Sequence, residues 1–315
     1  MNLLVTGGAG FIGSNFIKYI LSKYEEKYNV VNYDLLTYAG NLNNLLTVKD
    51  SLNYKFVKGD INNQQLVDYV IKTYDIDVIV NFAAESHVDR SIENPGIFIK
   101  SNVQGVQILL EAAKENKIKK FIQISTDEVY GSLDNEGYFT EETPLAPNSP
   151  YSASKASADL IVRAYHETFN LDINITRCSN NYGPFQYTEK LIPKLISKAL
   201  KNEVIPIYGN GENIRDWLHV IDHCSAIDMV IHNGTSGSIY NIGGNNEKSN
   251  NEIAQIILKK LNISQNLIKH VDDRLGHDFR YAVDSRKIQK ELGWAASIDL
   301  ERGLDDVISW YRCHL

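Results

Sequence analysis

The sequence has little cysteine. It contains three in 315 residues, Cys178, Cys224 and Cys313, which lie far apart and form no CxxC pair. Zinc sites and disulfide frameworks depend on clustered or regularly spaced cysteines, so the sequence suggests neither. No apolar run approaches the roughly 20 residues of a membrane-spanning helix, and a predicted strand directly after Met1 leaves no room for a signal peptide. These absences predict a reducing, cytoplasmic compartment and no metal site.

The chain also lacks an excess of positive charge. Its 32 Lys and Arg residues are outnumbered by 39 Asp and Glu residues, which gives a formal net charge of -7. Nucleic acids and membrane surfaces attract basic proteins, so we expect neither as a partner. With 43% hydrophobic residues, a chain of 315 residues can bury a large core and usually divides into two lobes. Cations that bind an anionic small substrate would have to be gathered locally.

A glycine-rich turn follows the first predicted strand. Residues 2–6 form a short apolar run, and residues 7–13 read Gly-Gly-Ala-Gly-Phe-Ile-Gly before a helical pattern that continues through Tyr24. Glycines between a strand and a helix allow a tight turn and let a pyrophosphate approach the backbone at the helix N-terminus. The run fits two registers, Gly7-Gly10-Gly13 and Gly8-Gly10-Gly13. Its context predicts a dinucleotide-binding turn.

A second predicted strand, residues 30–33, ends at Asp34, about twenty residues beyond the last glycine. An acid at this spacing binds the adenosine ribose hydroxyls in dinucleotide-binding folds. The alternative is an acid that only caps a turn. Because a carboxylate repels a 2′-phosphate, the sequence predicts NAD rather than NADP as the cofactor.

Strands and amphipathic helices then alternate. We expect further strands at residues 54–58, 78–82, 121–124 and 173–176, and helices at residues 64–74, 95–115 and 151–169. This alternation predicts an α/β fold with a Rossmann-type, doubly wound parallel sheet. Beyond Arg177 the period is lost, which indicates a smaller C-terminal substrate-binding lobe. We expect the cofactor domain to comprise residues 1–178 and about 219–243, and the lobe about 179–218 and 244–315.

The strand near Ile122 breaks abruptly into Ser125, Thr126, Asp127 and Glu128. In an open parallel sheet, ligands bind outside the carboxyl ends of the strands, so two acids at such an end indicate a site. The same residue types also suit the first turn of an ordinary helix, where they cap amides and favour the helix dipole. The stretch alone leaves both interpretations open.

Tyrosine and lysine four residues apart share one face of a helix. Three such pairs occur: Tyr19/Lys23, Tyr54/Lys58 and Tyr151/Lys155. About one is expected by chance, which makes the motif weak by itself. Only Tyr151/Lys155 opens a helix just after the strand-end acids, and we interpret the other two pairs as structural.

Together, Gly7-x-x-Gly10-x-x-Gly13, Asp34, Asp60-Ile61 and Tyr151-x-x-x-Lys155 resemble the extended short-chain dehydrogenase/reductase family. Within it, the strings Leu-Thr-Tyr-Ala-Gly-Asn at residues 36–41, Ala-Ala-Glu-Ser-His-Val-Asp-Arg-Ser at 83–91 and Ser-Thr-Asp-Glu-Val-Tyr-Gly at 125–131 are similar to the dTDP-glucose 4,6-dehydratase family. The resemblance covers nearly the whole chain. One departure is Phe279, where that family has a second arginine in its Gly-His-Asp segment.

The resemblance implies a hydro-lyase that uses NAD to oxidise carbon 4 of dTDP-glucose, eliminates water across carbons 5 and 6, and returns hydride to carbon 6. The product, dTDP-4-keto-6-deoxyglucose, would serve deoxysugar pathways such as dTDP-rhamnose synthesis. Tyr151, with a pKa lowered by Lys155 and the nicotinamide and a hydrogen bond from Thr126, would be the base for the hydroxyl. Glu128 would be the base at carbon 5 and Asp127 the acid at carbon 6, since adjacent acids in a dry cleft push their pKa values apart.

The remaining site residues follow from the same resemblance. The expected cofactor contacts are Gly7, Gly10, Phe11, Ile12, Gly13, Asp34, Leu35, Thr37, Asp60, Ile61, Ala83, Ala84, Ser86, Ser101, Tyr151, Lys155 and Asn181. The expected substrate contacts are Ser86, His87, Thr126, Asn180, Lys190, Leu191, Pro206, Tyr208, Arg215, Asn250, Arg274 and His277. Each of these polar residues could equally be a solvated surface group.

Three alternatives stay open. A nucleotide-sugar 4-epimerase has no need for paired acids, a 4,6-dehydratase of another nucleotide sugar is compatible with every residue named, and a non-catalytic dinucleotide sensor needs neither the acids nor Tyr151/Lys155.

The helix of residues 95–115 has an apolar stripe formed by Val103, Val106, Leu110 and Ala113. Such stripes are more often core, although relatives in the family pair such helices into a homodimer.

Overall fold

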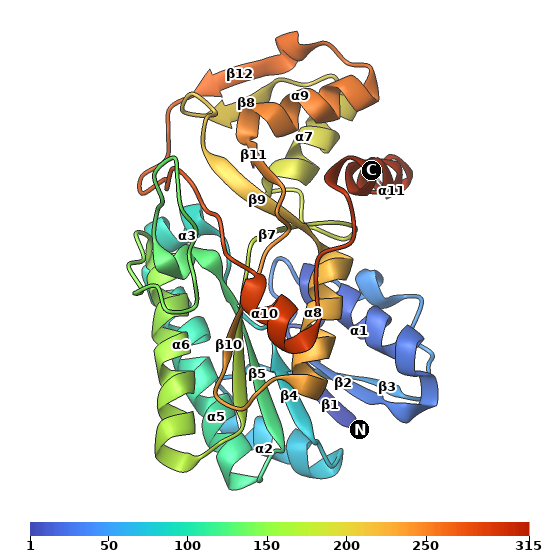
Figure 1. Cartoon of the computed structure of the whole chain (residues 1–315). Coiled ribbons are helices and arrows are strands. Elements are labelled where there is room, and N and C mark those ends of the chain that lie inside the picture. Colours follow the sequence, from blue (N-terminus) through green and yellow to red (C-terminus); the bar gives the residue numbers. More distant parts are fainter. Residues whose placement is uncertain (315) are drawn as a thin grey trace.

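The computed structural model describes residues 1–314. Figure 1 shows a large sheet flanked by helices in the lower half of the view and a smaller group of strands and helices above it. The large sheet has seven strands in the order β10–β6–β5–β4–β1–β2–β3, all paired in parallel. Its strands are β1 (Asn2–Thr6), β2 (Asn29–Asp34), β3 (Tyr54–Lys58), β4 (Val78–Asn81), β5 (Lys120–Thr126), β6 (Ile173–Cys178) and β10 (Ile239–Ile242). This confirms the doubly wound sheet.

Helices cover both faces of this sheet. One layer contains α1 (Phe11–Tyr24), α8 (Val220–Asn233) and α10 (Arg286–Leu292); the other contains α2 (Gln64–Thr73), α5 (Gly105–Glu115) and α6 (Pro150–Phe169). In β1, Leu3 and Val5 pack in the first core and Leu4 in the second, because successive side chains of a strand point to opposite faces. The strand order reverses between β1 and β4, which places a ligand crevice at their carboxyl ends.

The helix expected at residues 95–115 contains a feature that periodicity did not predict. It runs through α4 (Pro95–Phe98), a π-helical turn (Ile99–Gln104) and α5. The amide of the buried Asn102 accepts from Glu85 N (2.8 Å) and donates to Glu85 O (2.9 Å) and Ser154 Oγ (2.9 Å). The turn therefore ties the loop after β4 to α6. Such π turns occur frequently at functional sites.

Three of the four residues of the apolar stripe on this helix belong to the core, and Val103 is half-buried. Val106, Leu110 and Ala113 are at most 1% exposed and pack against the sheet of their own chain. The tyrosine–lysine pairs interpreted as structural also have structural surroundings. Lys23 forms an ion pair with Asp228 at 2.6 Å, and Tyr54 OH accepts from Asn32 Nδ2 at 2.9 Å.

The upper group has its own core. A three-stranded sheet has the order β11–β9–β7, and β12 pairs with β8 in parallel. These elements are β7 (Asn180–Tyr182), β8 (Ile205–Tyr208), β9 (Ile214–His219), β11 (Glu247–Ser249), β12 (Ile268–Val271), α7 (Leu191–Leu200), α9 (Asn250–Leu261) and α11 (Leu300–His314). Ser249 and Glu252 form a capping box at the start of α9. The three helices pack around Leu195, Ile257 and Leu304.

The remaining helical segments are short. They are α3 (Val88–Glu93) and 3-10 turns at Glu25–Lys27, Leu42–Leu45, Asp127–Tyr130 and Gln265–Leu267. Residues 131–149 form no helix or strand. Within residues 1–314, none of the helices has the length and apolarity needed to cross a bilayer.

Candidate active site

One cavity of about 320 Å³ lies at the carboxyl edge of the large sheet. It brings together all the expected cofactor contacts and all five expected catalytic residues, although they come from distant parts of the sequence. Of the expected substrate contacts, Ser86, Thr126, Asn180 and Lys190 also line it. The structure therefore gathers both sets of residues into a single site.

The structure shows why the turn after β1 needs glycine at residues 7, 10 and 13. Gly7 has φ +67°, and a Cβ placed there would lie 2.6 Å from Ala83 N. A Cβ at Gly13 would lie 2.5 Å from Gly7 O, whereas at Gly10 the nearest atom is Gly7 O at 3.3 Å. Gly7, Gly10 and Gly13 line the cavity and Gly8 does not, which selects one of the two registers. Gly10 thus keeps open the space in front of the first amides of α1, where an anion is favoured.

Asp34 connects the end of β2 to this turn. Its carboxylate accepts from Ala9 N (2.9 Å) and Leu36 N (2.7 Å), and it is 8% exposed. Burial raises the pKa of Asp34, and the two backbone N–H donors oppose that rise. The carboxylate lines the cavity next to Leu35 and Thr37, where it can accept hydrogen bonds from a ribose.

At the end of β5, the acids both belong to the first turn of a helical segment and line the site. Thr126 caps a 3-10 turn, accepting from Glu128 N at 3.3 Å, and Asp127 and Glu128 form the first turn while lining the cavity. Burial, then Glu128 and Asp216, raise the pKa of Asp127 well above its usual value. Burial also raises the pKa of Glu128, but the cations Arg274, Lys190 and Arg215 oppose this rise.

Tyr151 opens α6 beside these acids. Ser149 caps the helix, and its hydroxyl accepts from Ser152 N (3.1 Å). Burial, then Glu128, Cys178 and Asp127, raise the pKa of Tyr151 well above its usual value, while a hydrogen bond with Thr126 opposes the rise. The lowered pKa that we expected depends on Lys155 together with bound nicotinamide, and without the cofactor the pKa is raised instead.

The position of Lys155 explains this difference. Its ammonium donates to Ile124 O at 2.6 Å, and burial lowers its pKa. Asp159 and Cys178 are the groups that raise the pKa of Lys155. The charge of Lys155 is thus directed at the strand end, and the chain's own groups favour a neutral Tyr151.

The other expected substrate contacts do not line the cavity. Arg215 is buried, donates to the carbonyls of Ile214 (2.7 Å), Asp278 (2.9 Å) and Phe279 (3.2 Å), and stacks on a tyrosine ring. His87 Nε2 lies 3.8 Å from Glu189 Oε2. Leu191, Pro206 and Asn250 lie in α7, β8 and α9.

A cluster above the cavity joins the two halves of the chain. Arg274 Nη1 lies 3.9 Å from Asp89 Oδ1, and Tyr208 OH donates to Asp89 Oδ2 at 3.4 Å. The rings of Tyr208 and His277 have centroids 6.4 Å apart, and His277 Nδ1 contacts Asp273 Oδ1 at 2.6 Å. Three expected substrate contacts therefore lie together here, and Arg274 lowers the pKa of Glu128.

Several cavity residues were not among the expected cofactor and substrate contacts. They include Glu85, Cys178, Ser179, Gln186, Tyr187 and Glu189. Glu189 Oε1 accepts from Tyr38 OH at 3.1 Å. The available signal for Glu189 was its neighbour Lys190, an expected substrate contact that lines the same cavity.

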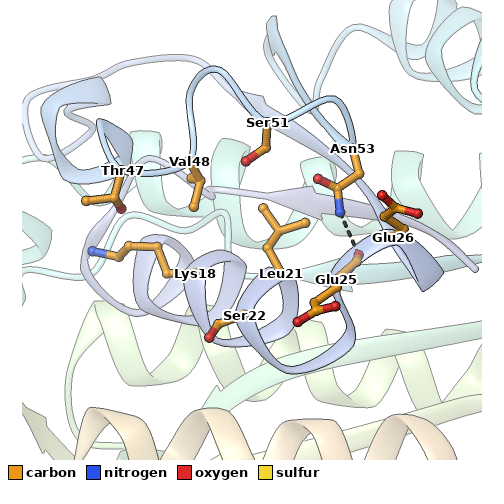
Figure 2. Close-up of a pocket in the computed structure, with 9 residues that line it drawn as sticks. All are labelled: Lys18, Leu21, Ser22, Glu25, Glu26, Thr47, Val48, Ser51 and Asn53. Atoms are coloured by element: carbon orange, nitrogen blue, oxygen red, sulfur yellow. Dashed lines mark hydrogen bonds between the residues drawn. The ribbon is translucent and has the colours of Figure 1, made fainter.

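A second depression lies between α1 and the loop at residues 47–53. Figure 2 shows its lining, which includes Lys18, Glu25 and Glu26, and the bond from Asn53 Nδ2 to Glu25 O (2.7 Å). It contains none of the expected site residues. We therefore assign no function to it.

The fold and the cavity together define a nucleotide-binding enzyme of the extended short-chain dehydrogenase/reductase type. The chain belongs to the GDP-mannose 4,6 dehydratase family, whose profile matches residues 4–307. It is 49% identical to a dTDP-glucose 4,6-dehydratase of Streptomyces niveus, over 99% of this chain and 93% of the relative.

Two solved structures are similar to this chain. The dTDP-glucose 4,6-dehydratase DesIV of Streptomyces venezuelae, with NAD and TYD bound, has a TM-score of 0.96 and 47% identity over 99% of this chain and 97% of its own. The dTDP-glucose 4,6-dehydratase of Bacillus anthracis, in complex with NAD, has a TM-score of 0.94 and 54% identity with the same coverage.

Proposed function

We propose that this chain is an NAD-dependent dTDP-glucose 4,6-dehydratase that forms dTDP-4-keto-6-deoxyglucose. The observation that carries the proposal is the pair Asp127 and Glu128, which share one cavity with Tyr151 and have different electrostatic surroundings. The identities of 47–54% to named dTDP-glucose 4,6-dehydratases support the choice of reaction and of nucleotide.

The residues of the cavity fit NAD. Gly10 leaves room for a pyrophosphate at the N-terminus of α1, whose first turn contains no acid that would repel it. The Asp34 carboxylate suits the adenosine ribose and disfavours a 2′-phosphate. When bound, NAD accepts hydride from carbon 4 and later returns it to carbon 6, and its cationic nicotinamide favours the ionised form of Tyr151.

Tyr151 would remove the proton of the carbon 4 hydroxyl. Its hydrogen bond with Thr126 favours the ionised phenol, in opposition to burial. Tyrosine has an ordinary pKa of about 10, so it requires such help to act as a base near neutral pH. Oxidation at carbon 4 makes the proton on carbon 5 acidic, which prepares the elimination.

The elimination needs one ionised and one protonated carboxyl. Asp127 is the group to stay protonated, because burial and the charges of Glu128 and Asp216 disfavour its ionised form. Glu128 is the group to stay ionised, because Arg274 and two further cations stabilise its charge. Glu128 would take the carbon 5 proton while Asp127 protonates the departing carbon 6 hydroxyl.

The substrate would extend from the cavity toward the upper group. Lys190, Ser86 and Asn180 line the cavity, which supports their role as sugar contacts, and Lys190 Nζ donates to Ser86 O at 2.8 Å. Arg274 and Arg215 supply positive charge near Glu128 despite the overall charge of -7. We propose that these arginines, with His277, Tyr208, Asn250 and their neighbours, hold the nucleoside diphosphate.

Incubation with NAD and dTDP-glucose tests this function. Mass spectrometry should show a product lighter by one water, and the Asp127→Asn variant should not form it. UDP-glucose and GDP-mannose, offered separately, test the choice of nucleotide. A product of unchanged mass with inverted carbon 4 would indicate an epimerase instead, and binding of NAD without any conversion would indicate a sensor.

We further propose a homodimer formed through α6 and the helix preceding it. Four outward positions of α6, spaced like one helix face, are exposed or half-buried: Ala153, Ser157, Leu160 and Ala164. Leu160 is 56% exposed, and Ile99 on the neighbouring π turn is 53% exposed. Helices with small and apolar outward residues pack closely, which supports this face as the interface.

We also propose the two-lobe division stated above, with the large sheet as the cofactor domain. Its support is that β10 and α8 pack with the large sheet although they follow β9 in the chain. A reducing compartment such as the cytoplasm is supported by three free cysteines, Cys178, Cys224 and Cys313. Supply of dTDP-rhamnose synthesis is the downstream role that we propose.

A further inference from the structure

Residues 183–190 connect β7 to α7 and form no helix or strand. Four residues of this segment, Gln186, Tyr187, Glu189 and Lys190, line the cavity. A segment without a backbone ladder needs contacts from other elements to keep one position. The contacts that hold this segment therefore determine the shape of one wall of the site.

Phe185 is the strained point of the segment. Its φ is +70°, a region that bulky residues rarely adopt and keep only when their surroundings fix them there. Its ring lies between two groups. Lys18 Nζ is 3.2 Å from the ring centroid, and the Trp310 ring is 4.9 Å away at an interplanar angle of 61°. Both contacts have the geometry of favourable cation–π and aromatic pairs.

The backbone on either side of Phe185 is also tied. Asn15 Nδ2 donates to Pro184 O at 3.0 Å, and Tyr311 OH donates to Gln186 O. Asn15 belongs to α1 and Tyr311 to α11, so the first and the last helices of the chain both hold the segment. Figure 1 shows α11 beside α7, the helix that follows this segment.

Lys18 and Trp310 are suited to this role. Among residues 1–314, Lys18 forms no ion pair, and its ammonium lies over the Phe185 ring. Trp310 also packs edge-on against Tyr311, with centroids 4.7 Å apart. Tyr311 is 2% exposed in the core of the upper group, which anchors the pair.

We propose that Phe185, Trp310 and Tyr311 form an aromatic clamp that positions residues 186–190 against the nucleotide sugar, so that the C-terminal helix sets substrate affinity. The inference rests on the proposed function for the identity of the substrate. None of the three residues lines the cavity, so they are positioning residues. The acids and Tyr151 belong to other elements, and Lys190 is the residue of this segment whose charge acts on Glu128. Loss of the clamp should therefore raise KM by a larger factor than it lowers kcat.

Steady-state kinetics with dTDP-glucose at saturating NAD test the clamp. Phe185→Leu and Trp310→Leu should each raise KM about tenfold or more, with a smaller factor lost in kcat. Phe185→Tyr keeps the ring and should restore a near-normal KM. Lys18→Met keeps the apolar stem, removes the charge and leaves the core intact, and it should raise KM by a smaller factor.

Phe169 offers a matched control. Its ring has an ammonium neighbour, Lys114 at 4.6 Å, and an aromatic neighbour, Tyr165 at 5.2 Å, but it ends α6 away from the cavity and is 48% exposed. Phe169→Leu should leave KM unchanged. A rise in KM equal to that of Phe185→Leu would show a general loss of stability and would overturn the clamp.

Hydrogen exchange of the NAD-bound protein gives a second readout that does not need turnover. Amides of residues 183–190 should exchange faster in Phe185→Leu and Trp310→Leu, with the large sheet unchanged. If wild type does not convert dTDP-glucose but shows this exchange pattern, the proposed substrate is wrong and the clamp is supported. Exchange and KM equal to wild type, or a fall in kcat at constant KM, would overturn the clamp.

Discussion

Replacement of Gly10 by alanine should weaken cofactor binding and leave the stability of the fold nearly unchanged. Gly10 has φ -76° and ψ -179°, which alanine adopts without strain, and its Cβ would meet only Gly7 O at 3.3 Å. Gly→Ala at a compatible position stabilises by about 0.4–1 kcal/mol through the unfolded chain, and the tight contact offsets part of this. The free energy of unfolding without NAD should therefore change by less than about 1 kcal/mol.

The added methyl group enters the space that we assign to the pyrophosphate, so affinity for NAD should fall. A ligand at 100 times its Kd stabilises the folded state by about 2.7 kcal/mol, and a hundredfold weaker ligand at that concentration contributes only about 0.4 kcal/mol. Denaturant unfolding with and without NAD measures both quantities. The Gly13→Ala variant is the contrast, because its Cβ would lie 2.5 Å from Gly7 O and should cost about 1–3 kcal/mol in the absence of NAD.

Two results would refute this reasoning. If NAD stabilised Gly10→Ala as strongly as wild type, the pyrophosphate would not lie in front of Gly10. If Gly10→Ala unfolded as readily as Gly13→Ala without NAD, the difference in space between the two positions would not govern the turn.

Three further outcomes are expected. Asp34→Ala should weaken NAD and relax the exclusion of NADP, as cofactor titrations would show; equal affinity of wild type for both cofactors would contradict this role. Glu128→Gln and Asp127→Asn should form NADH from dTDP-glucose and then stall, whereas Tyr151→Phe should form almost no NADH. Single-turnover absorbance measures this NADH. If none of the three variants formed it, the division of roles between the acids and Tyr151 would be wrong. In the pH profile of kcat, the acid limb should lie above the ordinary glutamate pKa, since burial raises the pKa of Glu128. Arg274→Gln removes a cation that stabilises ionised Glu128 and should move this limb to higher pH. A limb that does not move would exclude Glu128 as its source.

Local patterns were sufficient to predict six of the seven strands of the large sheet, and β10 (Ile239–Ile242) was not among the predicted strands. The strands predicted at residues 54–58 and 78–82 agree with β3 (Tyr54–Lys58) and β4 (Val78–Asn81), because buried parallel strands are continuous apolar runs and the helices between them have a clear period. The cofactor turn was equally accessible, since glycine at residue 7 meets a backbone requirement that the structure shows as a positive φ.

Features that depend on contacts between distant parts of the chain could not be predicted from the sequence. The π turn at Ile99–Gln104 lies where Asn102 bonds to Glu85 and Ser154, and helical periodicity does not indicate those partners. The raised pKa of Tyr151 in the chain without cofactor was not predicted, because burial and neighbouring acids depend on tertiary packing. The position of Phe185 between the first and last helices is of the same kind.

The path of the hydrogens tests the central claim most directly. If Glu128 removes the carbon 5 proton, that proton exchanges with water, whereas hydride carried from carbon 4 to carbon 6 inside a closed site never meets solvent. Turnover in deuterium oxide should place deuterium at carbon 5, and label introduced at carbon 4 should appear at carbon 6 of the same molecule. Mass spectrometry of product from mixed labelled and unlabelled substrate reads both. Label that crosses between molecules, label that returns to carbon 4, or an absence of solvent deuterium at carbon 5 would contradict the roles assigned to Asp127, Glu128 and Tyr151.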